Sequence, residues 1–331
     1  MPSQLLTLPR LASGGLITNY FCTSACRHCL YRCSPGWPKE YITAEMALRN
    51  LEAVRRLGCT AVHVGGGEPL LRPDGLADVL DAARQAGVRI EYVETNSSWY
   101  QDHASACAVL EKLAEHGLDT LLVSISPLHN ERIPFYKVKG VLAACRQVGL
   151  SILPWIADFF TDLAAFDERR PHAPEEYCQR FGEDYWATLP RRYWIAPGGR
   201  ALETFGGFRP QKPLVRLAAE GSQGCGELAE VGHFHLDLYG NYIPGLCAGL
   251  AIRRDDLGAP LNPEDYPLIA RLFAGGIGAL AAYAAEMYGF APSKPAYGSK
   301  CEVCYEVRRF LVVDKGVNSK ELAPRGHYLY G

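Results

Sequence analysis

The feature that most constrains the fold is a regular alternation of short apolar runs and longer amphipathic segments between residues 15 and 156. This alternation predicts parallel strands joined by right-handed helical crossovers. With a further strand expected at 193–197, the sequence predicts an α/β fold, an open partial (β/α)6 barrel of the TIM type. The other expected strands cover residues 15–20, 59–64, 88–93, 120–125 and 150–156, and the expected helices cover 43–57, 74–86, 104–116 and 135–148.

The first expected strand leads into three closely spaced cysteines, Cys22, Cys26 and Cys29, with the spacing C-x3-C-x2-C. Thiolates suit iron–sulfur clusters and zinc. Three ligands on one loop could hold a four-iron cluster and leave one iron open to a substrate or cofactor. Two alternatives stay open, a zinc knuckle and a ferredoxin-like site in which Cys33 is the fourth ligand. The ferredoxin run has a shorter first gap and a proline after its fourth cysteine, where this chain has Ser34.

Three further strand ends carry glycine or polar side chains, in segments 65–69, 94–97 and 126–130. The carboxyl ends of parallel barrel strands share one edge, and barrel folds place their sites there. We therefore expect these segments to lie near the cysteine loop.

The cysteine motif and the segment Gly65-Gly66-Gly67-Glu68-Pro69 together resemble the radical S-adenosylmethionine (radical SAM) superfamily, over about residues 14–160. The family has an aromatic residue before the last cysteine, where this chain has His28. The resemblance implies a 4Fe–4S cluster on Cys22, Cys26 and Cys29, with S-adenosylmethionine (SAM) at the open iron. For the other implied SAM contacts, tight turns and helix capping are the structural alternatives. These contacts would come from Gly66, Gly67, Glu68, Glu94, Asn96, Ser124 and Ser126.

His129 and Glu131 follow the fourth expected strand, on the presumed active edge. They are the candidate catalytic residues, since they offer a base and a carboxylate to a substrate. An ordinary solvated loop is the alternative interpretation.

A glycine-rich boundary is expected at 210–226, and four more cysteines stand at its end and beyond it, at positions 225, 247, 301 and 304. The first two flank an expected hairpin with its turn at 239–242. The last two form a C-x2-C after a periodic helical run at 266–287. The thiolates of Cys225, Cys247, Cys301 and Cys304 could hold one complete metal site, either a cluster or a four-cysteine zinc ribbon.

This layout resembles the twitch domain of radical SAM enzymes, the shorter relative of the SPASM domain. Six residues separate Gly240 from Cys247, where the family usually has four. The resemblance implies one auxiliary 4Fe–4S cluster, with an open iron if Cys225 is not a ligand. The expected domains are a radical SAM partial barrel at 1–215 and a small α+β iron–sulfur domain with a β-hairpin at 216–331.

Composition limits the remaining function classes. The net charge of -2 over 331 residues gives no electrostatic basis for binding nucleic acid or an anionic membrane. No apolar run is expected to span a membrane and no signal pattern opens the chain, so a cytoplasmic protein is expected. His233 and His235 share one face of a strand, as a polar face or a metal pair. The isolated cysteines are expected to be buried free thiols: Cys59, Cys107, Cys145 and Cys178.

The resemblance implies a radical SAM oxidoreductase. Reductive cleavage of SAM would give a 5′-deoxyadenosyl radical, which abstracts hydrogen from a substrate, and the protein would position that substrate. An auxiliary cluster suggests oxidation, cross-linking or epimerisation of a peptide, and dehydrogenation or rearrangement of a small metabolite is the alternative. A flavodoxin- or ferredoxin-type reductant is the expected partner. The rival from another class is a non-catalytic iron–sulfur electron carrier.

Overall fold

The computed structural model describes residues 5–330 and divides the chain into two compact units. The barrel unit comprises residues 15–27 and 33–195, and the C-terminal unit comprises 1–14, 28–32 and 196–331. The C-terminal unit thus begins about twenty residues before the boundary expected from the sequence, and it includes two short N-terminal segments. As functional domains, 1–215 and 216–331 stay a prediction.

The barrel unit is built on parallel strands in the order β5-β4-β3-β2-β1. All five strands expected between residues 15 and 156 form, each within a few residues of its expected bounds. The sheet does not close, which confirms the expected open, partial barrel. The strands are β1 (Gly14–Ile17), β2 (Ala61–Gly65), β3 (Arg89–Thr95), β4 (Thr120–Ser124) and β5 (Ser151–Trp155).

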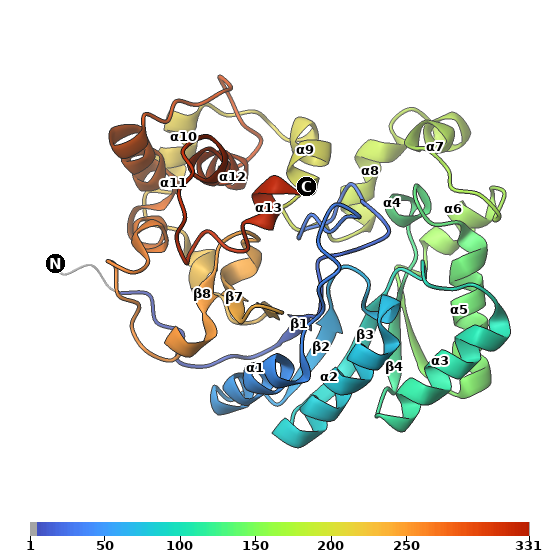
Figure 1. The fold of residues 1–331 in the computed structure, drawn as a ribbon. Helices are drawn as coiled ribbons and strands as arrows, with labels where there is room; N and C mark the ends of the chain where they lie inside the picture. Colours follow the sequence, from blue (N-terminus) through green and yellow to red (C-terminus); the bar gives the residue numbers. More distant parts are fainter. Residues whose placement is uncertain (1–4, 331) are drawn as a thin grey trace. The chain divides into compact units, whose positions relative to one another are not determined.

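The crossover helices pack beside one another in chain order, and Figure 1 shows them along the strands. The Thr43 hydroxyl caps the first of them by accepting from Met46 N at 3.1 Å. Their apolar faces are buried by amphipathic packing, as the sequence predicts. The helices are α1 (Ala44–Arg56), α2 (Pro73–Ala86), α3 (His103–Glu115) and α5 (Phe135–Val148), with short turns η1 (Pro69–Leu71) and α4 (Pro127–Asn130) at strand ends.

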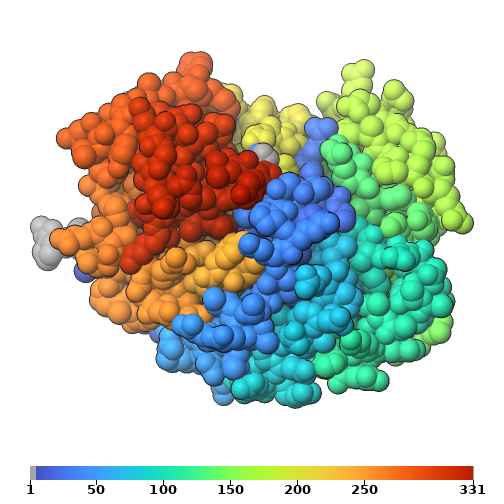
Figure 2. Space-filling view, in the orientation of Figure 1, coloured from blue at the N-terminus to red at the C-terminus, as the bar shows by residue number. Residues whose placement is uncertain are grey.

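The sixth strand expected at 193–197 is wrong. Tyr193 ends helix α8 (Tyr185–Arg192), and irregular chain follows it. The expected helical connection before it does form, as α6 (Phe159–Ala164), α7 (Pro174–Phe181) and α8. Figure 2 shows this segment, in yellow-green, at the surface.

Strand β5 is therefore the open edge of the barrel unit. Ser151 N donates to Asp119 O at 2.9 Å and Ile125 N donates to Trp155 O, so residues 151 and 155 direct their backbone groups toward β4. Because the backbone N–H and C=O groups of successive residues in a strand point to opposite sides, those of Ile152 and Pro154 point toward the open edge. Pro154 has no N–H to offer there.

The C-terminal unit contains the expected hairpin. Strands β6 (Phe234–Asp237), β7 (Asn241–Ile243) and β8 (Ile252–Arg253) pair in antiparallel order. The Asp237 carboxylate accepts from the backbone N–H groups of Tyr239 and Asn241 and fixes the turn. The helices are α9 (Ala201–Phe205), α10 (Leu214–Glu220), α11 (Pro267–Tyr288), α12 (Lys300–Arg309) and α13 (Gly326–Leu329), with short turns η2 (Gly206–Phe208), η3 (Gly226–Ala229), η4 (Pro244–Leu246), η5 (Arg254–Asp256) and η6 (Phe310–Asp314).

Helix α11 bears on the expectation that no apolar run of the chain is long enough to span a membrane. Within residues 5–330 it is long and apolar enough to cross a membrane by length and composition alone. Core helices of soluble proteins meet the same criterion, so the finding is weak evidence for a span. The helix is also interrupted at Gly276, and the buried Glu321 carboxylate accepts from Leu268 N and Ile269 N at its start.

Candidate cofactor and metal sites

The cysteine loop follows β1 directly. Cys22 and Cys26 are buried in the barrel unit, and Cys29 is half-buried in segment 28–32. The Cys22 sulfur accepts from Asn96 Nδ2 at 3.3 Å and from Ser24 N at 3.4 Å, and Ser24 Oγ lies 3.1 Å from the Cys26 sulfur. Hydrogen bonds to sulfur are among the contacts that tune cluster thiolates. The sulfurs are thus in a setting that suits ligation.

The glycine-rich loop after β2 lies against the chain that leads into Cys22. Gly67 N donates to Asn19 O at 2.7 Å, and a Cβ on Gly67 would lie 2.0 Å from Phe21 O. Any side chain at this position would displace the backbone. Asn19 also donates from Nδ2 to Phe21 O at 2.9 Å and to Glu68 O at 3.3 Å. Asn19 therefore joins the two loops, a role that the sequence did not reveal.

Glu68 connects the ends of β2 and β3. Its buried carboxylate accepts from Asn96 N at 2.7 Å, Thr95 Oγ1 at 3.0 Å and Leu70 N at 3.1 Å. Burial raises the pKa of Glu68 to about 7, against the opposing effect of these donors. The carboxylate is thus engaged within the protein, and a direct contact of Glu68 with a ligand would have to replace some of these hydrogen bonds.

The remaining predicted SAM contacts lie at the same strand ends. The Glu94 side chain is 43% exposed, and its Oε1 lies 3.8 Å from His63 Nε2. Ser124, the last residue of β4, is half-buried. Ser126 is buried and caps α4, with its Oγ 2.7 Å from His129 Nδ1. Glu94 and Ser124 are thus the more accessible side chains of this set.

The two candidate catalytic residues make contacts within the barrel unit. His129 is buried next to Ser126, and burial lowers its pKa to about 4, so the ring is neutral near pH 7. Glu131 accepts from Arg27 Nε through both oxygens at 3.0 Å. Arg27 follows Cys26 directly, so this ion pair anchors the cysteine loop to the segment after β4. Sequence reasoning missed Arg27, although it lies inside the motif.

Cys33 has a different environment from the motif cysteines. It is buried, and its thiol lies 3.7 Å from Gly66 O, in donor geometry. Cys247 makes a similar contact, with its thiol 3.8 Å from Gly245 O, so this geometry does not separate ligands from other cysteines. Cys33 as a fourth ligand therefore stays an open alternative.

The four C-terminal cysteines converge in the C-terminal unit. Burial is the main cause of a strongly raised pKa for Cys247, and the nearby sulfurs of Cys304, Cys301 and Cys225 raise it further. The thiols at 225, 247, 301 and 304 are therefore near enough for their charges to interact, and we call these four residues the thiol cluster.

Direct contacts between the segments that carry these cysteines support the thiol cluster. Lys300 Nζ donates to Glu227 Oε2 at 2.7 Å and so joins the start of α12 to the turn after Cys225. A Cβ on Gly245 would lie 2.0 Å from Glu227 O, so the loops of Cys225 and Cys247 are in close contact. Arg308 Nη1 donates to Ala248 O at 2.8 Å and joins α12 to the residue after Cys247.

Residues 16–154 match the family model described as the radical SAM superfamily. The chain carries a radical SAM domain. The matched region contains the cysteine loop and the glycine-rich loop, and the family implies a 4Fe–4S cluster and SAM as cofactors.

Comparison with solved structures finds similar chains at low sequence identity and low TM-score. Polyhistidine-tagged anSMEcpe with bound AdoMet has 12% identity and a TM-score of 0.45, and the alignment covers 97% of this chain and 99% of that chain. BtrN in complex with AdoMet and 2-DOIA has 14% identity and a TM-score of 0.41, with coverage of 81% and 89%. Streptococcus suis SuiB bound to precursor peptide SuiA has 12% identity and a TM-score of 0.32, with coverage of 72% and 60%.

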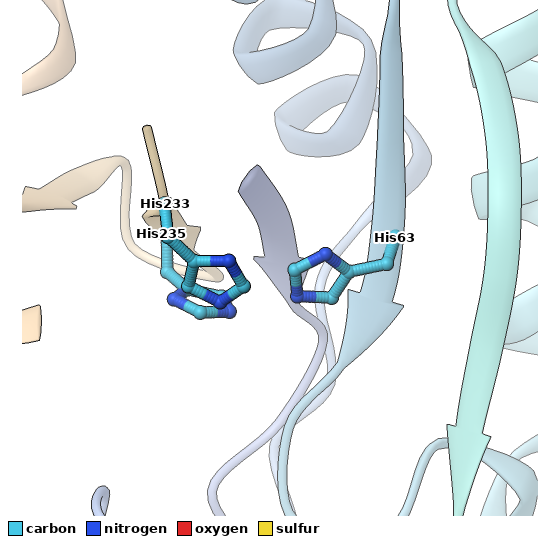
Figure 3. A group of neighbouring side chains, drawn as sticks. All are labelled: His63, His233 and His235. Atoms are coloured by element: carbon cyan, nitrogen blue, oxygen red, sulfur yellow. The ribbon is translucent and has the colours of Figure 1, made fainter. Parts of the chain in front are cut away.

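Outside the radical SAM domain, the predicted histidine pair is adjacent. His233 directly precedes β6 and His235 lies on it; Figure 3 shows the two rings close together, and their centroids are 5.1 Å apart. His235 Nδ1 lies 2.7 Å from the Tyr31 hydroxyl. A metal pair at these two residues stays a prediction. Of the isolated cysteines, Cys59, Cys107 and Cys145 are buried and Cys178 is half-buried.

Proposed function

We propose that this protein is a radical SAM oxidoreductase in which Cys22, Cys26 and Cys29 hold a 4Fe–4S cluster and SAM occupies the open iron. The observation that carries the proposal is the direct link between the family's two loops and β3. Asn96 donates to the Cys22 sulfur through its side chain and to Glu68 through its backbone. When bound, the cluster and SAM supply a 5′-deoxyadenosyl radical for hydrogen abstraction.

In this proposal the chain's own residues hold and orient the cofactor. Asn96 and Ser24 support the sulfurs of Cys22 and Cys26 through hydrogen bonds. Gly66 and Gly67 offer backbone groups to SAM, and Glu94 and Ser124 offer partly exposed side chains. Ser126 and Glu68 act indirectly, because each is engaged within the protein.

We further propose that the thiol cluster holds one auxiliary 4Fe–4S cluster. The four sulfurs are soft ligands on segments that direct contacts hold together. The substrate class that we favour is a peptide, which would be oxidised, cross-linked or epimerised, and a small metabolite is the alternative. A flavodoxin- or ferredoxin-type protein would supply electrons in the cytoplasm.

Single substitutions test the first cluster. Cys22→Ala, Cys26→Ala or Cys29→Ala should abolish formation of 5′-deoxyadenosine from SAM under dithionite. Cys33→Ala is the matched control on the same loop, and it should retain the activity. Loss of activity in Cys33→Ala as well would favour a ferredoxin-like, four-thiolate site.

Metal content tests the second cluster. After anaerobic reconstitution the wild-type protein should carry about eight irons per chain, and the Cys22/Cys26/Cys29→Ala triple variant about four. Zinc without iron in the triple variant would show a structural four-cysteine site. If the wild-type protein carries iron but neither binds nor cleaves SAM, it is the electron carrier.

A further inference from the structure

A buried arginine lies beside the thiol cluster. Arg308 is 5% exposed and lies on α12, four residues after Cys304 and seven after Cys301. This spacing places all three residues on one face of the helix. Arg308 Nε donates to Cys304 O at 3.2 Å, and its Nη1 donates to Ala248 O at 2.8 Å. The guanidinium thus contacts the backbone of two segments that carry cysteines.

The charge of Arg308 has no carboxylate to balance it among the described residues. Arg308 Nη1 also donates, at 2.9 Å, to the Tyr328 hydroxyl, which is neutral and itself donates to Gly249 O at 2.7 Å. A buried charge is costly unless an opposite charge lies nearby. The groups next to Arg308 that can become anionic by binding a metal are the sulfurs of Cys247 and Cys304.

We infer that Arg308 is a positioning residue for the auxiliary cluster, which raises the cluster's reduction potential by placing a permanent buried cation beside its thiolates. This inference rests on the proposed second cluster. Net charge and hydrogen bonding around the sulfurs set the potential of an iron–sulfur cluster. Reduction adds one negative charge, so a nearby cation stabilises the reduced form more than the oxidised form.

The other cation at the site offers a contrast. Lys300 precedes Cys301, but its ammonium is paired with the Glu227 carboxylate at 2.7 Å. Lys300 and Glu227 both lie near Cys225 and Cys301 and act on their thiols in opposite directions, so the charge of Lys300 is largely balanced. Arg308 has no such carboxylate partner among the described residues. Removal of Arg308 should consequently shift the potential more than removal of Lys300.

The experiment is a redox titration, followed by electron paramagnetic resonance, of the full-length Cys22/Cys26/Cys29→Ala protein with and without Arg308→Gln. Arg308→Gln should make reduction of the cluster roughly tenfold less favourable, a downward shift of about 59 mV for one electron. Arg308→Lys retains the positive charge, so the reduction potential of the cluster should stay close to that of the protein with Arg308. Arg309→Gln removes an exposed charge from the next position and is the matched control, so it should change little.

Unchanged potential in Arg308→Gln, with four irons retained, would overturn the inference and leave the auxiliary cluster intact. A full shift in Arg308→Lys would also overturn it, because hydrogen bonding and not charge would then set the potential. If the Arg308→Gln protein does not load iron, the potential of the Arg308→Lys protein decides the matter: a shift of about 59 mV would overturn the inference, and a potential close to that with Arg308 would support it. Zinc in place of iron in the triple variant would overturn the second cluster itself, and this inference with it.

Discussion

At the scale of single residues, the strand-end carboxylates have different roles. Glu68 and Glu131 are both acidic residues of the predicted active edge. The sequence predicts that Glu68 contacts SAM and that Glu131 is a catalytic candidate. In the structure, Glu68 accepts from three donors of the protein and Glu131 pairs with Arg27. A sequence shows which residue types stand at a strand end but not which neighbour each side chain contacts.

Glu68 makes folding stability depend on pH. Burial raises its pKa from 4.5 to about 7, so the folded protein binds this proton more tightly than the unfolded chain. Stability from this group is complete below pH 4.5 and is lost as the pH rises through 7. The loss should reach about 3 kcal/mol, since one pKa unit corresponds to about 1.4 kcal/mol. Urea unfolding at several pH values should show this slope in the wild type and not in Glu68→Gln, whereas the exposed Glu115→Gln should retain it.

Glu131→Gln tests whether this residue acts in catalysis or holds the cysteine loop. Arg27 is 45% exposed, so the ion pair should add less than about 1 kcal/mol to global stability. The loop should nevertheless be less well held, and a chelator should remove iron from the first cluster severalfold faster. Time courses of iron loss measure this, with the exposed Glu111→Gln as the control. Full iron retention combined with lost SAM cleavage would contradict the anchoring role and support catalysis.

At the scale of elements, the sequence predicted most of the fold. Each expected helix and strand between residues 15 and 156 formed, because apolar periodicity and caps such as Thr43 are local signals. The hairpin turn formed for the same reason. The strand at 193–197 failed because its signal was an apolar run alone. Whether such a run joins a sheet depends on a partner strand, and the structure ends the sheet at β5.

Helix α11 depends on a distant side chain for its first turn. The Glu321 carboxylate accepts from Leu268 N at 2.9 Å and from Ile269 N at 2.9 Å, more than fifty residues away in sequence. Glu321→Ala would leave both buried N–H groups without this acceptor, which should cost about 1–3 kcal/mol each before relaxation. Urea unfolding should show this loss. Glu321→Gln keeps an acceptor oxygen and should lose less, and an equal loss in both variants would show that charge matters more than hydrogen bonding.

At the scale of the whole molecule, the two proposed metal sites should be separable by mutation. Cys301→Ala should reduce iron from about eight to about four per chain and leave formation of 5′-deoxyadenosine in place, because the radical SAM motif is unchanged. Turnover of the substrate should be lost. Iron analysis and product chromatography on one preparation measure these quantities. Loss of all iron in Cys301→Ala would show that the first cluster cannot assemble without the thiol cluster.

The sequence predicted both groups of cysteines, but it did not predict the contacts that the neighbouring segments make. The spacing of Cys301 and Cys304 reveals a pair, while their convergence with Cys225 and Cys247 depends on contacts such as Lys300 with Glu227. The membership of residues 28–32 in the C-terminal unit had no sequence signal either. Both features depend on long-range packing, which a local pattern does not encode.

The proline on β5 has a consequence for how this protein behaves in concentrated solution. An unclosed sheet exposes a row of hydrogen-bonding groups that a strand of another molecule can extend, which is a common route to aggregation. Pro154 removes one donor from that row at its outward-facing position. The open edge of the sheet is therefore less able to pair with a strand of another molecule. Pro154→Val would restore the donor, and light scattering should then detect concentration-dependent assemblies that the natural sequence avoids.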